Sequence, residues 1–143
     1  MILRTSKTKW LELKDFEGVR IRIDYPTVEQ NENLREKFFQ VIFNNPNYTR
    51  EEKAPVIELT FEQKAKEKRL LGEIAKDTIK YCVKDWEGIK AEDGEIIPCK
   101  IVNNELDKDL FESFINNLEY HHLIRIGNLI EDEIKLTEAD KKK

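Results

Sequence analysis

Long hydrophobic runs are missing from this sequence. No apolar stretch approaches the roughly 20 residues that a membrane-spanning helix needs. The first ten residues, MILRTSKTKW, contain neither the apolar segment nor the small-residue cleavage site of a secretory signal peptide. We therefore expect a cytoplasmic protein that does not act at a membrane.

Cysteine and histidine are too scarce for a recognisable metal site. The only two cysteines, Cys82 and Cys99, are expected to be separate thiols, as is usual in a reducing compartment. The only two histidines, His121 and His122, are neighbours. Adjacent residues on a helix point about 100° apart, which hinders binding of one ion by both. The sequence therefore predicts no metal ligands.

Motifs that carry catalysis are also missing. The five glycines are not grouped as they are in phosphate-binding loops. Acidic residues are abundant on charged helix faces, where abundance indicates solubility rather than acid–base catalysis. We expect no catalytic residues and no cofactor. The least favoured alternative is a small enzyme that uses Cys99 or a histidine, and it would require an exposed thiol of low pKa.

Charges of both signs are mixed along the chain. Charged residues make up 38% of the 143 residues and give a net charge of −4, with lysines mostly interleaved with glutamates. A nucleic-acid binder would show a basic stripe, so nucleic acid is not an expected partner. The hydrophobic fraction of 39% suffices for one modest core. We expect a single domain over residues 1–143.

The N-terminal part has the alternation of a half-buried strand. Apolar and charged side chains exchange every second residue in the segment GVRIRIDY, residues 18–25. A second short strand begins at Trp10, and Gly18 can adopt positive φ in the turn between them. The sequence predicts a β-hairpin element over residues 1–26, closed by Pro26.

Helical periodicity dominates residues 27–136. Thr27 is a predicted N-cap, and Thr60 with Gln63 resembles a capping box at the start of the strongest helix. A polar, turn-rich loop over 44–55 connects these helices. Gly72 lies inside the second helix, where it would permit close packing.

The C-terminal part predicts two further helices. Asn104 is the expected N-cap, and residues 116–119 are the expected break. Residues 137–143 are polar and are expected to form a flexible tail. The predicted fold is therefore α+β and mainly helical, with an N-terminal β-hairpin and a short central two-strand connector.

The connector is the segment VKDWEGIKAEDGEIIPCK, residues 83–100. Gly88 would allow a sharp exit from the helix expected to end near Trp86, and Asp93–Gly94 is a favoured turn dipeptide. Ile96 and Ile97 would return to the core, and Pro98 would stop further pairing. Trp86 is large enough to anchor the connector against the helices.

An apolar stripe in the C-terminal helices is consistent with two interpretations. It is either the core of the protein or, in its exposed fraction, a surface that receives a partner helix. Its members are Phe111, Phe114, Leu118, Leu123, Ile126 and Ile130.

The connector resembles a segment of the tail assembly chaperones of long-tailed, siphovirus-like bacteriophages. The resemblance consists of Trp86-Glu87-Gly88-Ile89, the acidic turn Glu92-Asp93-Gly94 and the apolar step to Pro98. The layout of the chain is also similar, from the small β element closed by proline to a helix that starts with Thr27 and Glu29. The last residues, Lys141–Lys143, could be encoded on a slippery A-rich run, as a programmed frameshift in such proteins requires.

The resemblance implies a non-catalytic function in the cytoplasm of a bacterial host. A chaperone of this kind binds the tape-measure protein and helps to recruit tail-tube subunits. It implies that the stripe residues bind the partner, that Trp86, Gly88, Asp93, Gly94 and Pro98 hold the scaffold, and that homo-oligomers form. An alternative is a structural tail or head–tail connector protein that oligomerises in the virion.

Overall fold

Four α-helices and two small β-sheets make up the computed structural model, which describes residues 9–141 and side chains up to residue 135. In chain order the elements are β1 (Lys9–Glu12), β2 (Arg20–Ile23), α1 (Val28–Asn44), the 3-10 helix η1 (Pro46–Tyr48), α2 (Phe61–Cys82), β3 (Val83–Glu87), β4 (Ile101–Val102), β5 (Glu105–Leu106), α3 (Lys108–Asn116) and α4 (Tyr120–Lys141). The chain is 53% helical and carries an N-terminal hairpin, which confirms the predicted α+β class.

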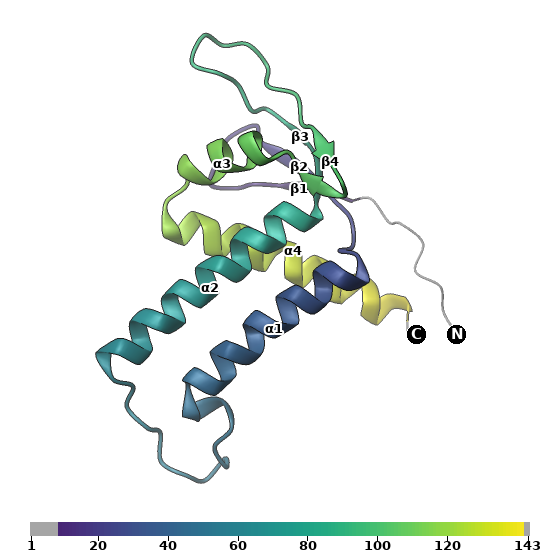
Figure 1. Ribbon diagram of the computed structural model, residues 1–143. Helices are drawn as coiled ribbons and strands as arrows, with labels where there is room; N and C mark the ends of the chain where they lie inside the picture. Colours follow the sequence, from purple (N-terminus) through teal and green to yellow (C-terminus); the bar gives the residue numbers. More distant parts are fainter. Residues whose placement is uncertain (1–8, 142–143) are drawn as a thin grey trace.

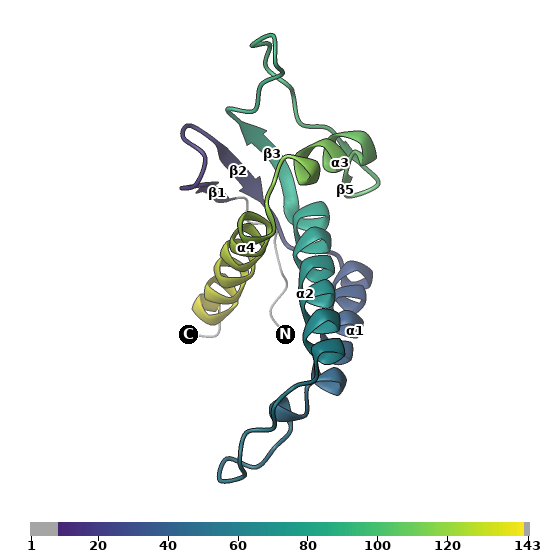
Figure 2. The ribbon, with the colours of Figure 1, turned by 90° about the vertical axis from the view of Figure 1, so that its left-hand side faces the viewer.

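Helix α2 is the centre of the arrangement (Figure 1). It contacts α1 on one side and α4 on another, and it continues directly into β3 of the antiparallel sheet β1-β2-β3. The α1–α2 hairpin extends away from this sheet, and the β3–β4 connector projects from the opposite end (Figure 2). Within the described part of the chain, every helix lacks the combination of length and apolar character that crossing a bilayer requires.

The N-terminal hairpin forms as its alternation predicts. Ile21 and Ile23 are buried, and Ile21 pairs with Leu11 across the hairpin. The turn is closed by the amide of Leu13, which donates to the carbonyl of Val19 at 2.9 Å. The alternation thus predicted this element, whose first eight residues lie outside the described part of the chain, while its register comes from the structure.

Both predicted helix starts are confirmed. Gln30 N donates to Thr27 Oγ1 at 3.1 Å, and the Gln30 side chain accepts from the amide of Thr27 at 3.0 Å. Thr60 and Gln63 make the same reciprocal pair at 3.1 and 2.9 Å. Each box satisfies two backbone donors that the first helical turn leaves unpaired.

The second helix ends earlier than expected. Helix α2 stops at Cys82, and Val83–Glu87 is the third strand of the sheet rather than more helix. Strand β3 pairs with β2, with Trp86 opposite Ile21 and Val83 opposite Ile23. The backbone groups of Val83–Glu87 form hydrogen bonds with the open edge of β2, and this pairing buries both Val83 and Trp86.

The connector keeps its predicted turn but not its second strand. Gly94 has φ of +86°, and Ala91 N donates to the carbonyl of Glu95 at 2.8 Å, as expected for a turn at Asp93–Gly94. Beyond that turn, pairing is limited to one bridge between Lys90 and Ile96. The expectation for Ile96 was wrong, since its side chain is 75% exposed.

The separate two-strand sheet lies further along the chain. Strands β4 and β5 form a tight hairpin whose turn residues, Asn103 and Asn104, have φ of 51° and 62°. Asn104 is therefore not a helix cap, because asparagine is used here for its tolerance of the left-handed region. Asp107 caps α3 instead, accepting from Leu110 N at 3.3 Å.

The C-terminal helices break where the sequence predicts and extend further than it predicts. Helix α3 ends at Asn116 and α4 begins at Tyr120, which confirms the break. Helix α4 then runs to Lys141. The prediction of a flexible tail from residue 137 was therefore wrong for residues 137–141. Residues 142–143 lie outside the described residues.

Two glycines set the contacts of α4 with α2. A Cβ built on Gly127 would lie 2.9 Å from Ala75 Cβ and 3.1 Å from Ala75 Cα, so only glycine allows this approach. A Cβ on Gly72 would meet the ring edge of Tyr120 at 3.2 Å. Gly72 therefore permits the close packing expected of it, although the tighter contact is at Gly127.

We predict that Gly127→Ala destabilises the protein and that Gly72→Ala does not. Alanine adds helix propensity of about 1 kcal/mol at either position. At Gly127 the new methyl group meets main-chain atoms of α2 and has to push two helices apart, which costs roughly 1–3 kcal/mol. At Gly72 it meets the partly exposed ring of Tyr120, which can move.

Thermal unfolding followed by circular dichroism measures both effects. We expect a lower Tm for Gly127→Ala, by about 2–4 °C per kcal/mol lost, and an equal or higher Tm for Gly72→Ala. Equal losses in both variants would contradict the assignment of the tight crossing to Gly127 and Ala75.

Candidate functional site

Three of the six residues in the predicted partner-binding stripe are buried, and the other three are partly exposed. Leu123, Ile126 and Ile130 on α4 are all at most 5% exposed and belong to the core. Their expected role at a partner surface was wrong, because α4 packs this face inward. The other three residues, Phe111, Phe114 and Leu118, lie partly exposed at the edge of the core.

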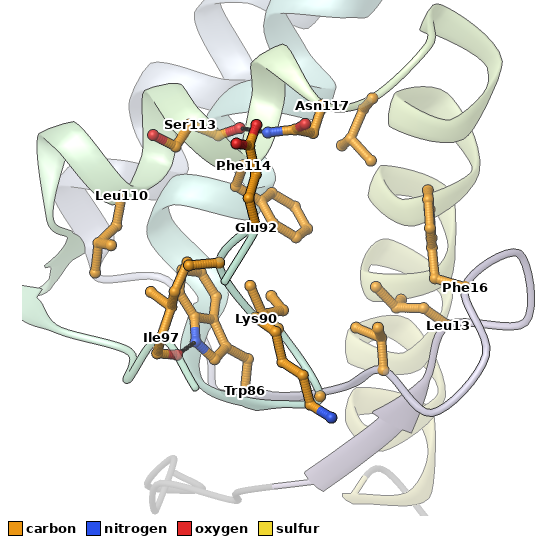
Figure 3. A pocket seen from close by; sticks show the side chains of 15 residues that line it. Leu13, Phe16, Trp86, Lys90, Glu92, Ile97, Leu110, Ser113, Phe114 and Asn117 are labelled. Atoms are coloured by element: carbon orange, nitrogen blue, oxygen red, sulfur yellow. Dashed lines mark hydrogen bonds between the residues drawn. The ribbon is translucent and has the colours of Figure 1, made fainter. Parts of the chain in front are cut away.

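An apolar cleft of about 440 Å³ opens beside Phe114 (Figure 3), and Leu118 also lines it. Its walls come from three parts of the chain that are distant in sequence: the β1–β2 turn, the connector from Trp86 to Ile97, and α3 with the residues that follow it. The apolar lining residues are Leu13, Phe16, Val19, Trp86, Ile89, Ala91, Ile97, Leu110, Phe114 and Leu118.

Trp86 holds the floor of this cleft. Its indole Nε1 donates to the carbonyl of Ile97 at 2.7 Å, and its ring stacks on Phe114 with centroids 5.8 Å apart and planes 19° apart. The indole is 7% exposed, so this hydrogen bond satisfies a buried donor. These two contacts join the connector to α3.

Gly88 lets the connector pass close to the hairpin turn. It has φ of +85°, and a Cβ built on it would lie 2.1 Å from the carbonyl oxygen of Gly18. Any side chain here would collide with main-chain atoms, so only glycine fits, at the exit from β3 rather than from the helix that was predicted.

The other predicted scaffold residues lie outside the cleft lining. Asp93 Oδ1 accepts from the amide of Glu95 at 3.0 Å and, with Gly94, shapes the tip of the connector loop. Pro98 is exposed and follows Ile97, whose carbonyl is taken by Trp86. These residues shape the loop but do not contribute to the lining.

The polar groups at the cleft are few. Among the described residues that line it, the ionisable side chains are Lys90 and Glu92, and both are exposed on the connector. Asn117 Nδ2 is engaged with the carbonyl of Ser113 at 2.7 Å. An apolar floor with a polar rim suits an apolar side chain of a partner better than a reacting substrate.

Both cysteine thiols are held in the neutral form. Burial raises the pKa of Cys82 to about 12 and that of Cys99 to about 11. The Asp85 carboxylate raises the pKa of Cys99 further, while the Arg22 guanidinium acts weakly in the opposite direction. Since the thiolate is the nucleophile, neither cysteine has the low pKa that the enzyme alternative requires.

The two histidines lie closer together than expected. At the start of α4 their rings are 4.0 Å apart, and ligand atoms of Glu119, His121 and His122 all lie within 4.8 Å of one another. Within the described residues, these three are the group that could hold a metal. His122 Nδ1, however, accepts from the amide of Glu119 at 3.4 Å, and the positive end of the helix dipole disfavours a cation there.

Sequence reasoning missed one wall of the cleft. Leu13, Phe16 and Val19 lie in or beside the turn of the N-terminal hairpin. The sequence predicts the hairpin here but no part in a cleft. Phe16 offered a signal, because a large aromatic residue in a turn usually has something to pack on. Which element it packs on depends on the path of the connector.

We predict that Cys99 reacts slowly with thiol reagents. A pKa near 11 leaves far less thiolate at pH 8 than a free model thiol has, so alkylation should be at least tenfold slower than for a small free thiol. The rate should rise with pH up to about 11. Mass spectrometry of iodoacetamide-treated protein measures this, with Cys99→Ala as the control for any labelling of Cys82. Reaction faster than the free thiol would restore the enzyme alternative.

Comparison of the chain with models of known protein families, with curated proteins and with solved structures gave no match.

Proposed function

We propose that this protein is a non-catalytic tail assembly chaperone of a long-tailed bacteriophage, acting in the cytoplasm of the bacterial host. Its client would be the tape-measure protein, and it would help to recruit tail-tube subunits. One observation carries the proposal: the connector segment that resembles this family also lines part of the apolar cleft. Trp86, Gly88 and Ile89 belong to both.

The cleft has the size and character for an apolar anchor of a partner helix. Its volume of about 440 Å³ falls within the range of roughly 300–1,000 Å³ that is usual for pockets binding small molecules, which is enough room for one or two large side chains. A client helix that presents such residues at positions i and i+3 or i+4 could place them against Phe114 and Leu118. The contact would exclude water from surface that both partners would otherwise expose.

The charged surface fits the same role. A chaperone of apolar segments has to remain soluble while it exposes apolar surface itself. Here 38% of the residues are charged, and both signs are mixed along the chain. A small apolar cleft on a protein whose surface is otherwise charged favours weak, reversible binding. A factor that leaves the finished particle needs binding of this kind.

A second candidate is a structural tail or head–tail connector subunit. It is favoured by a separate observation, the exposed phenylalanines of α1, since Phe43 is 84% exposed. Such a protein would remain in the particle, whereas a chaperone would not. Mass spectrometry of purified virions distinguishes the two, because only the structural subunit would be found there in stoichiometric amount.

We predict that Leu118→Glu abolishes client binding. The change puts a charge at a half-buried position of the cleft lining, where an apolar anchor would have to desolvate it. The tape-measure protein of the same phage is co-expressed with the tagged chain, and the amounts that remain soluble and co-purify are measured. We expect at least a tenfold loss of co-purified tape-measure protein.

The matched control is Ile96→Glu, the same kind of change at an exposed connector residue that does not line the cleft. It should bind as the unchanged chain does, and circular dichroism should show that both variants fold. If the unchanged chain does not retain the tape-measure protein, the proposed function is wrong. If both variants retain it, the client does not occupy this cleft.

A further inference from the structure

Helix α1 turns polar side chains toward its neighbour α2. Lys37 forms an ion pair with Asp77, and Asn44 Nδ2 donates to the carbonyl of Gln63 at 2.8 Å. Asn45 Nδ2 also donates across this interface, to a Glu67 carboxylate oxygen at 3.1 Å. The buried residues of α1 are Gln30 and Val41 only.

Its outer face carries exposed apolar side chains that cover nothing within the chain. Val28 is 80% exposed, Phe39 is 49% exposed and Phe43 is 84% exposed. At about 100° per residue, positions 28, 32, 35 and 39 fall within about 60° of one another, so they form one stripe along the helix. The stripe therefore reads Val28, Glu32, Arg35, Phe39, with an apolar residue at each end and opposite charges in the middle.

This stripe is complementary to itself. When two copies of α1 lie antiparallel about a two-fold axis midway between residues 33 and 34, Val28 faces Phe39 of the other copy. Glu32 then faces Arg35 of the other copy, and each of these pairs occurs twice. A two-fold interface requires such reciprocal matching, because the same patch serves both partners.

The two central charges are available for pairing between copies. Within the described residues, neither Glu32 nor Arg35 takes part in an ion pair or a side-chain hydrogen bond. In the interface they would be flanked on both sides by apolar pairs, which lower the local dielectric and strengthen the attraction.

We propose that a second copy of this chain packs antiparallel on the outer face of α1. Phe43 then extends past the stripe and lies opposite residue 24, just before the other copy's α1 begins, which would shield its exposed ring. Helix α1 is roughly 25 Å long, so the interface is smaller than that of a permanent dimer, and micromolar association is expected.

The surface is free for this contact. Helix α1 packs against α2 and η1, and α2 lies between α1 and α4 in Figure 2, although Arg35 and Phe38 at one edge of α1 border a pocket that residues of α4 also line. The apolar cleft is lined by the hairpin turn, the connector, α3 and residues just after α3, with none from α1. Dimer formation would therefore leave the cleft open, so this inference does not depend on the proposed function.

Charge reversal tests the pairing directly. Sedimentation equilibrium over a range of protein concentrations measures the association of the unchanged chain, which we expect to dimerise. Glu32→Arg alone and Arg35→Glu alone place like charges opposite each other twice, and each should weaken the dimer at least tenfold. The double variant Glu32→Arg/Arg35→Glu restores both pairs and should recover dimerisation.

Two controls accompany this series. Lys66→Glu reverses an exposed charge on α2 and should leave association unchanged. Val28→Cys/Phe39→Cys should form an intermolecular disulfide upon oxidation, because the two positions face each other. A chain that stays monomeric at all concentrations would overturn the proposal and leave the α1 face to a different protein. A dimer that neither charge reversal weakens, or that the double variant does not recover, would overturn this interface.

Discussion

The burial of Trp86 is the constraint on which the other parts of this structure depend. Pairing of β3 with β2 directs the indole into the core, where its N–H group has to find an acceptor. The carbonyl of Ile97 provides it, which brings the connector back across the molecule. The ring then stacks on Phe114 and so positions α3. The cleft lies between the connector and α3, the two segments that Trp86 contacts, and the turn of the N-terminal hairpin.

The position of Trp86 also fixes the position of helix α2, because α2 continues into β3 without a loop. Asp24 N donates to the carbonyl of Cys82 at 2.9 Å, which ties the junction to the end of β2. On another side, α4 crosses α2 at the contact of Gly127 with Ala75. The cleft lies beyond the C-terminal end of α2, whereas the stripe of α1 lies on the side of α1 that faces away from α2, so each is available without the other.

Apolar residues in this chain therefore have three different uses. Leu123, Ile126 and Ile130 fill the core, Phe114 and Leu118 line the cleft, and the exposed residues of α1 cover nothing within the chain. A stripe of apolar residues in the sequence does not distinguish these uses. Only the position of the neighbouring element decides whether a face of a helix becomes interior, lining or free surface.

The sequence by itself determined the features that are local. The capping boxes at Thr27 and Thr60, the hairpin alternation and the turn glycines follow from hydrogen bonds and dihedral preferences within a few residues. The tertiary structure alone decided the end of α2, since β3 exists only because β2 offers an open edge. It also decided the inward face of α4 and the cleft, because both depend on contacts between residues far apart in the chain. Short-range preferences carry no information about such neighbours, so these parts could not be read from the sequence.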